Sequence, residues 1–151
     1  MLAKKGLHNM PTTLKSVFTS AEIEYLKSQR LCRIATVGPD GQPHVVPVSY
    51  RYNPDTDTID VSGHGGFAKR KKWRDVQNDP RVAVVIDDIV SVNPWKVRGV
   101  EVRGTVEVLA TGGETVIPSF DPEMFRITPK RVISWGLETE FRAAPNARSV
   151  N

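Results

Sequence analysis

The chain has 151 residues, of which 39% are apolar and 25% are charged, and its formal net charge at pH 7 is +4. This length fits one globular domain, and this composition excludes wholesale disorder. No apolar run approaches the roughly 18 residues that a membrane-spanning helix needs. The lysines near the N-terminus are not followed by the apolar stretch of a secretory signal, so we expect none here. Cys32 is the single cysteine, so we expect no intrachain disulfide and a cytoplasmic protein.

A short helix is the first predicted element, after a flexible tail over residues 1–16. It begins near Thr19 and ends near Lys27, and Glu22 lies three positions after Thr19, which is the spacing of a capping box. The acidic residues in its first turn also favour a helix start there.

A β-hairpin and a third strand follow. The β-rich runs 31–37 and 42–52 flank a Pro-Asp-Gly turn, and a further run covers 58–62. Proline cannot donate a hydrogen bond to a neighbouring strand, so Pro43 and Pro47 place the second run at a sheet edge or a bulge.

The stretch SGHGGFAKRKKWRD (62–75) joins a glycine-rich loop to a basic helix. We expect the loop over 63–66 and the helix over 67–77, and Asn-Asp-Pro at 78–80 stops the helix. Five of the 21 cations lie within six positions of this stretch: Lys69, Arg70, Lys71, Lys72 and Arg74.

The second half of the chain is rich in β-forming residues. A nearly continuous apolar run at 81–87 predicts a strand buried on both faces, and a linker over 88–98 follows it. Alternating residues predict a half-buried strand at 99–109 with a bulge at Gly104, before a turn over 110–113. Two short β-rich runs come next, at 124–128 and 131–135, and Pro-Lys separates them. We expect the polar C-terminal tail, 138–151, to be frayed.

Six or more short strands separated by turns, with few helices, indicate a mainly β protein. The helices do not alternate with strands, which disfavours a parallel α/β fold. We therefore predict one antiparallel barrel domain over 17–137, with short helices and a tail at each end.

The glycine loop and its cations form the strongest candidate site. Glycines let backbone N–H groups approach a ligand, and a helix N-terminus adds unpaired donors and about half a positive charge. Cations in the first turns oppose that charge unless an anion binds there, so the pattern favours a phosphate site. The spacing matches neither a P-loop nor a dinucleotide fingerprint, and the alternative is a solvated basic helix face.

No catalytic constellation is evident in the sequence. The separations of His8, His44 and His64 fit no zinc site, and of the three only His64, in the glycine loop, is a candidate ligand contact. We expect Cys32 to be a small core residue. The acidic pair at 87–88 is more typical of solvated or capping groups than of a metal site, so no metal is predicted. If the protein is an enzyme, a cofactor carries the chemistry.

The three tryptophans have different expected roles. Trp73 lies on the basic helix and is expected to pack against the core. Trp95 follows a proline and precedes Lys96 and Arg98, so a ring-stacking or interface role stands beside burial. Trp135 lies at a strand end, and its role stays open.

The chain resembles the pyridoxamine 5′-phosphate oxidase-like family over about residues 17–137, and four segments carry the resemblance. They are IATVGPDGQPHVVPV (34–48), KKWRDVQNDPRVAVVIDD (71–88), RGVEVRGTVEVL (98–109) and RITPKRVISWGLE (126–138). The last of them looks most like the actinobacterial branch that uses the deazaflavin coenzyme F420. The resemblance implies a split β-barrel, the fold of the flavin mononucleotide (FMN)-binding members, and a flavin or deazaflavin cofactor at the interface of a homodimer.

The resemblance also implies where the cofactor lies. Basic residues at the helix start would bind its phosphate, with Lys72 the best match to the family's lysine; these residues are Lys69, Arg70, Lys71 and Lys72. The ring would lie against the second and third strands, near Pro47, Val48, Ser49, Ser62 and Gly63. Side chains of the partner subunit would reach the cofactor, with Trp95, Arg98 and Trp135 as the candidates.

The expected function is hydride transfer between F420 and a small conjugated or quinone-like substrate. The family's arginine and histidine for the phosphate of pyridoxamine have no counterpart here, which disfavours oxidation of that compound. The alternatives are an FMN-dependent oxidase or reductase and a non-catalytic cofactor-binding protein. Nucleic-acid binding ranks lower, because the few aromatic residues (7%) are not arrayed with the cations.

Overall fold

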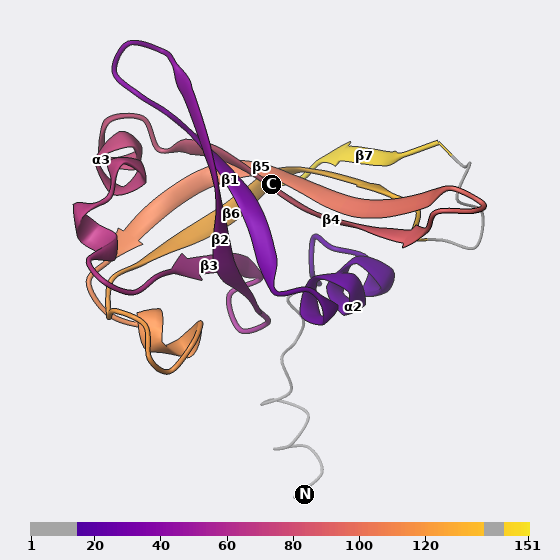
Figure 1. Ribbon diagram of the computed structural model, residues 1–151, viewed down its shortest axis with the longest axis horizontal. Coiled ribbons are helices and arrows are strands. Elements are labelled where there is room, and N and C mark those ends of the chain that lie inside the picture. The colour runs from indigo at the N-terminus through magenta and orange to yellow at the C-terminus, as the bar shows by residue number, and fades with distance from the viewer. Residues whose placement is uncertain (1–14, 138–143) are drawn as a thin grey trace, which may run out of the picture.

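The computed structural model describes residues 15–137 and 144–151 (Figure 1). Within these residues the chain forms seven strands, two α-helices and two short 3₁₀-helices. In chain order they are α2 (Ser20–Ser28), β1 (Leu31–Val37), β2 (Pro43–Asn53), β3 (Thr58–Ser62), η1 (Phe67–Lys69), α3 (Lys71–Asn78), β4 (Arg81–Ser91), β5 (Lys96–Leu109), η2 (Gly113–Thr115), β6 (Met124–Trp135) and β7 (Asn146–Ser149). None of the helices in the described part of the chain is long and apolar enough to cross a bilayer.

The strands form a closed antiparallel barrel. The sheet order is β3-β2-β1-β4-β5-β6-β7, and an additional pairing of β3 with β6 closes six of these strands on themselves. Closure removes most exposed sheet edges, which otherwise invite pairing with other chains. The predicted mainly β, antiparallel split-barrel fold is confirmed.

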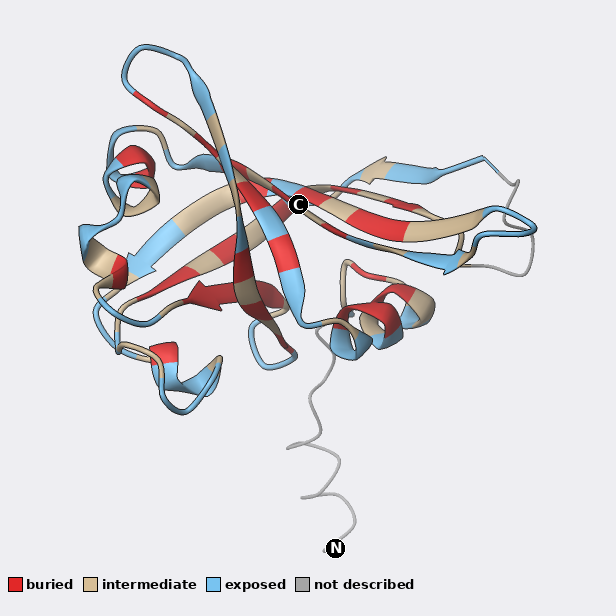
Figure 2. Ribbon diagram, in the orientation of Figure 1, coloured by how far each residue is buried: buried red, intermediate tan, exposed pale blue. Residues whose placement is uncertain are grey.

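The core lies inside the barrel, where alternate residues of several strands meet (Figure 2). In β1, for example, Cys32, Ile34 and Thr36 are fully buried, while their neighbours face outward. The same alternation occurs in β4 and β5, where every second side chain points into the core: Val84, Ile86, Val100 and Val102.

The predicted helix start is confirmed. Thr19 is the N-cap of α2: its side chain accepts from the Glu22 amide, and the Glu22 carboxylate accepts from the Thr19 amide in return. This capping box satisfies two backbone donors that a helix start otherwise leaves unpaired.

The proline-containing half of β2 is a sheet edge, as the sequence predicts. Residues 43–48 pair with β1 on one side, whereas pairing with β3 begins only at Ser49. Across the described residues, no strand pairs with the other side of 43–48. The missing N–H groups of Pro43 and Pro47 are therefore tolerated, because this half of the strand has one neighbour instead of two.

The expected helix over 67–77 was wrong in detail. A 3₁₀ turn covers Phe67–Lys69, Arg70 is extended with φ −78° and ψ 157°, and the α-helix begins at Lys71. Arg70 is the N-cap of α3, so only Lys71 and Lys72 of the predicted cations lie in the first turn of the α-helix.

Two expectations for the second half of the chain were also wrong. The linker at 88–98 consists mostly of strand, since β4 extends to Ser91 and β5 begins at Lys96. The two runs at 124–128 and 131–135 form one strand, β6, because a register shift opposite the Arg103/Gly104 step absorbs the extra residue. That shift confirms the predicted irregularity at Gly104, where an added Cβ would lie 2.1 Å from the Thr128 carbonyl oxygen.

Burial and the C-terminus correct two further expectations. Strand β4 is buried on one face only, since Ala83 and Val85 remain partly exposed. The expected frayed tail instead includes β7, which pairs with β6, while residues 138–143 lie outside the described part. Arg148 of β7 makes an ion pair of 2.6 Å with the buried carboxylate of Glu22 in α2, and this contact fixes the segment.

Candidate functional site

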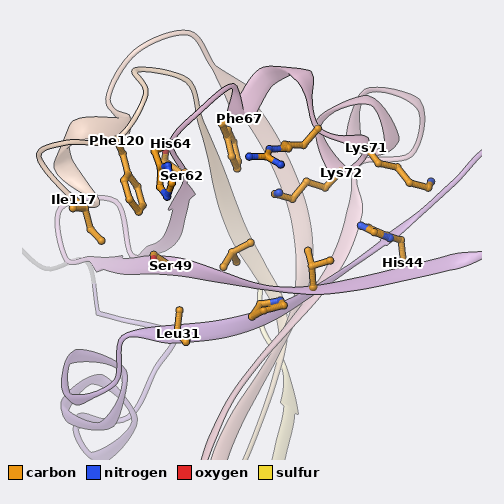
Figure 3. A pocket seen from close by; sticks show the side chains of 15 residues that line it. Leu31, His44, Ser49, Ser62, His64, Phe67, Lys71, Lys72, Ile117 and Phe120 are labelled. Atoms are coloured by element: carbon orange, nitrogen blue, oxygen red, sulfur yellow. The ribbon is translucent and has the colours of Figure 1, made fainter.

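A cavity of about 770 Å³ opens between the β1–β2 hairpin on one side and η1, α3 and the segment around residue 120 on the other (Figure 3). Its volume lies within the roughly 300–1,000 Å³ that cofactor pockets occupy. The lining residues are Leu31, His44, Val46, Pro47, Val48, Ser49, Ser62, Gly63, His64, Phe67, Arg70, Lys71, Lys72, Ile117 and Phe120.

Two cations at the start of α3 line this cavity without a carboxylate partner. Across the described residues, neither Arg70 nor Lys72 makes an ion pair with an acid. Lys72 is partly buried, and its ammonium lies 5.2 Å from the centre of the Phe67 ring. Burial, and then the charge of Arg70, lowers the pKa of Lys72. Because neither cation has a carboxylate partner in the described chain, this end of the cavity has unbalanced positive charge.

Lys71 has a different environment from Lys72. Its ammonium lies 3.0 Å from the carboxylate of Asp75, which is buried and also accepts a hydrogen bond from Thr36. Burial favours the neutral acid, but these hydrogen bonds outweigh it and lower the pKa of Asp75. Lys71 therefore compensates a buried charge, and in Figure 3 its side chain points away from that of Lys72.

The glycine loop does not offer all its backbone donors to a ligand. The amides of Gly66 and Phe67 donate to one carboxylate oxygen of Asp121, at 2.9 and 2.8 Å. Gly65 and Gly66 have positive φ values of 70° and 97°, a conformation that glycine adopts without strain. The sequence argument assigned these donors to a phosphate, whereas the structure pairs them with an acid of the chain.

The opposite wall comes from the free edge of β2. Val46, Pro47, Val48 and Ser49 line the cavity where β2 has no neighbour on that side up to residue 48. An edge strand presents unpaired backbone N–H and C=O groups, which can hydrogen-bond a polar heterocycle. The apolar side chains beside them suit the faces of a flat ring.

Eight of the eleven predicted site residues line this one cavity: Pro47, Val48, Ser49, Ser62, Gly63, Arg70, Lys71 and Lys72. The hydroxyl of Ser62 is already used, because it donates to the carbonyls of Asp121 and Glu123. The other three residues, Lys69, Trp95 and Arg98, are not among those that line it.

Trp95 and Arg98 belong to the β4–β5 hairpin. Trp95 lies in its turn and is 56% exposed, and Arg98 pairs with Asp88 at 2.8 Å and stacks on the Tyr25 ring. Trp135 packs directly over Gly99, where an added Cβ would lie 2.5 Å from the indole. Their predicted reach into a partner subunit stays a prediction.

Several lining residues were not predicted from the sequence. Leu31, Ile117 and Phe120 come from segments far apart in the chain, and no local pattern marks them. His64 lines the cavity, as proposed for a ligand contact, and its ring is 5.9 Å from that of Phe120. His44, expected only as a surface residue of a strand, also lines it, and His8 lies outside the described residues.

The other side chains considered as candidates pack in the core or form ion pairs. Cys32 is fully buried, as expected, and burial raises the pKa of its thiol to about 12. Trp73 packs against the core, also as expected, and stacks on Phe125 with the ring centres 5.6 Å apart. Asp87 and Asp88 pair with arginines, and no cluster of three metal-binding side chains occurs within residues 15–137 and 144–151.

Comparison with known proteins places the chain in a family. The family model described as pyridoxamine 5′-phosphate oxidase matches residues 18–136. A 5a,11a-dehydrotetracycline/5a,11a-dehydrooxytetracycline reductase of Streptomyces rimosus is 40% identical over 133 residues, which is 88% of this chain and 93% of the relative.

Solved structures share the fold. A conserved hypothetical protein of Mycobacterium tuberculosis aligns with a TM-score of 0.63 at 23% identity, covering 83% of this chain and 89% of that one. A FAD-binding protein of Mesorhizobium loti aligns with a TM-score of 0.55 at 25% identity, covering 74% and 86%. The match over most of the barrel and the long, 40% identical relative show that the chain belongs to the pyridoxamine 5′-phosphate oxidase family of oxidoreductases.

Proposed function

We propose that the protein is an F420-dependent oxidoreductase that transfers a hydride between the deazaflavin and a small conjugated or quinone-like substrate. The observation that carries this proposal is the pair of cations, Arg70 and Lys72, which line the cavity without a carboxylate partner in the described chain. Two such charges next to each other are unfavourable unless an anion binds between them or solvent screens them. A cofactor phosphate supplies that anion.

The rest of the cavity suits a flat heterocycle attached to a phosphate. The free edge of β2 offers backbone groups to the polar rim of the ring, and Val46, Val48 and Phe67 offer apolar contacts to its faces. Each charge-assisted hydrogen bond from Arg70 or Lys72 to the phosphate contributes about 1.5–3 kcal/mol. When a cofactor carries the chemistry, the protein binds and orients it. Here the cations would bind the phosphate and the edge of β2 would orient the ring.

Bound in its reduced form, the deazaflavin supplies the hydride. The chain's own residues fix the cofactor's phosphate at α3 and leave the aromatic end of the cavity, near His64 and Phe120, open to the substrate. Solvent that enters this open end supplies the proton that accompanies the hydride.

The Streptomyces rimosus relative supports reduction of a conjugated substrate, since its name describes a reductase that acts on dehydrotetracyclines. The FAD-binding neighbour supports a flavin-type cofactor and therefore keeps FMN as the second candidate. A non-catalytic cofactor-binding protein is the third, and it differs from the others by binding a cofactor without turnover.

A side-by-side titration with F420 and FMN tests the proposal. We expect the fluorescence of F420 to change and to reach saturation at micromolar protein concentrations. Half-saturation with FMN should require at least tenfold more protein. The reverse order, or purification as a yellow protein with bound flavin, would favour the FMN alternative. Binding that falls steeply with salt for any polyanion would instead indicate a nucleic-acid site.

We also propose that the protein is a homodimer with the cofactor near the subunit interface. Large apolar side chains are exposed on the β4–β5 hairpin and on β2, and a second copy would cover them: Val45, Ile89, Val90, Val92 and Trp95. In this arrangement Trp95 and Arg98 of one subunit approach the cofactor of the other. Light scattering coupled to size exclusion should give twice the mass of the 151-residue chain, and a monomer mass contradicts the assembly.

A further inference from the structure

The segment between β5 and β6 forms one wall of the cavity. It contains η2 and contributes Ile117 and Phe120, which the sequence does not connect to the basic helix or to the glycine loop. In Figure 3 both side chains lie at the end of the cavity opposite Lys71 and Lys72, with Phe120 beside His64. This end of the cavity is aromatic and apolar, whereas the other end is cationic.

Asp121 joins this segment to the glycine loop. Its carboxylate accepts from the amides of Gly66 and Phe67, at 2.9 and 2.8 Å, and its own amide donates to the carbonyl of Gly63 at 2.8 Å. The Phe67 amide first, and then the Gly66 amide, lower the pKa of Asp121, so the carboxylate stays ionised at neutral pH. Asp121 therefore makes hydrogen bonds to both ends of the loop over 63–67.

Close packing holds the base of the segment. The buried hydroxyl of Ser62 lies 2.6 Å from the Glu123 carbonyl and 3.3 Å from the Asp121 carbonyl. At Gly113 an added Cβ would lie 1.9 Å from the Asp121 carbonyl oxygen, so this residue has no room for a side chain. Backbone contacts next to Phe120 therefore help to fix its position, and its ring also contacts that of His64.

The hydrogen bonds of Asp121 also influence which groups each end of the cavity offers to a ligand. Asp121 occupies the Gly66 and Phe67 amides of the glycine loop, whereas the side chains of Arg70 and Lys72 line the cavity and remain available to an anion. A substrate that approaches the ring of a cofactor held there meets Phe120, Ile117 and His64, whose rings and aliphatic atoms suit a flat conjugated molecule.

We propose that the segment 113–123 selects the substrate, with Phe120 as the specificity-determining side chain and Asp121 as the residue that positions it. The inference rests on the proposed function, and it names the substrate class as flat, conjugated, fused-ring carbonyl compounds. Phe120 limits how far such a ring system extends beyond the cofactor, so its size sets the number of fused rings that the cavity accepts.

The test compares two acceptors, the bicyclic menadione and the tetracyclic 5a,11a-dehydrotetracycline, with reduced F420 as donor. We expect Phe120→Ala to change the ratio of kcat/KM between the two acceptors at least fivefold, while the Kd for F420 changes less than twofold. Phe120→Leu, which keeps most of the side-chain volume, should restore at least half of the original selectivity.

Asp121→Ala tests the positioning role by two measurements, hydrogen exchange in the unliganded protein and the kinetics of turnover. We expect hydrogen exchange of the Gly66 and Phe67 amides to accelerate at least tenfold in the unliganded protein, and acceptor KM to rise about tenfold with kcat within twofold. Asp121→Asn retains an acceptor oxygen, so its amide exchange rates and its acceptor KM should lie between those of the wild type and of Asp121→Ala. Asp40→Ala is the matched control, because Asp40 also accepts a backbone hydrogen bond in a loop but does not line the cavity.

The outcomes separate this inference from the function on which it rests. Wild-type protein that binds no F420 contradicts both. F420 binding with unchanged acceptor selectivity in Phe120→Ala overturns the inference alone, as does faster exchange in Asp121→Ala with no change in acceptor KM.

Discussion

Lys71 and Lys72 are neighbours in the first turn of α3, but their side chains have different surroundings. Lys71 forms an ion pair with the buried Asp75, which Thr36 also contacts. Lys72 contacts the Phe67 ring and has no carboxylate partner within the described chain. We infer that the first lysine stabilises the fold and that the second binds the ligand.

Lys71→Ala should therefore affect stability more than cofactor binding. The change leaves the Asp75 carboxylate buried with one hydrogen bond from Thr36, and we expect the free energy of unfolding to fall by about 1.5 kcal/mol. The half-exposed ammonium of Lys71 keeps this loss small for an ion pair with a buried acid. Urea denaturation measures it, and a stable variant with tenfold weaker F420 binding would contradict this assignment.

Cys32 should be chemically inert in the folded protein. It has no exposed surface, and burial raises the pKa of its thiol to about 12, so almost no thiolate is present at pH 8. We expect a thiol-specific disulfide reagent to label it at least ~100-fold more slowly than in urea, at a rate set by opening of the barrel. Rapid labelling of folded protein would place Cys32 at an accessible site.

At the scale of elements, β7 is held by charge more than by apolar burial. Only four residues, Asn146–Ser149, form this strand, and none of them is buried. Arg148 donates to both carboxylate oxygens of Glu22 and to the Val17 carbonyl, and Ser134 of β6 donates to the same carboxylate. The C-terminal strand thereby neutralises an acid that caps α2 inside the protein.

Arg148→Ala should destabilise the protein by about 3 kcal/mol, because it leaves the Glu22 carboxylate buried without its cation. Thermal or urea unfolding measures the change. Arg131→Ala serves as the control, since Arg131 makes one exposed hydrogen bond to Ser149 of the same strand and should lose less than about 0.5 kcal/mol. Equal effects of the two changes would refute the role of the Glu22–Arg148 pair.

The same pair predicts a pH dependence. Burial alone would raise the pKa of Glu22, but hydrogen bonds from Arg148, Ser134 and the Thr19 amide outweigh it and lower the pKa. A carboxyl with a lowered pKa stabilises the fold above its unfolded pKa, and the stabilisation is lost as the pH falls through the folded value. The difference in unfolding free energy between wild type and Arg148→Ala should be full at pH 7 and shrink below about pH 4. A difference independent of pH would contradict the electrostatic explanation.

At the scale of the whole molecule, local patterns predicted the barrel because strand alternation and turns are local. The capping box at Thr19 and the irregularity at Gly104 were readable for the same reason. Strand β7 was not predictable, since its residues are polar and its main contact, between Arg148 and Glu22, spans 126 positions.

The candidate site was predictable where it is contiguous in the sequence. The glycines and the cations form one continuous stretch, and the resemblance to the family supplied the ring-contact residues of the second and third strands. Eight of the residues predicted in these two ways line one cavity. Phe120 and Asp121 were missed because only barrel closure brings their segment to the glycine loop. Lys71 and Asp75 have the i,i+4 spacing that a helix brings together, but the sequence does not show that Asp75 is buried, so the cations of this run could not be ranked before the structure.

Binding of F420 by Lys72→Ala and Arg74→Ala tests the central claim most directly, namely that unpaired cations at α3 hold an anionic cofactor. Arg74 lies on the same helix but is exposed, donates to the Lys69 carbonyl and does not line the cavity, so it matches the charge change without the contact. In fluorescence titrations we predict that Lys72→Ala weakens binding at least tenfold, about 1.4 kcal/mol, and Arg74→Ala less than twofold. An unchanged Kd for Lys72→Ala, or equal losses in both variants, would contradict the claim.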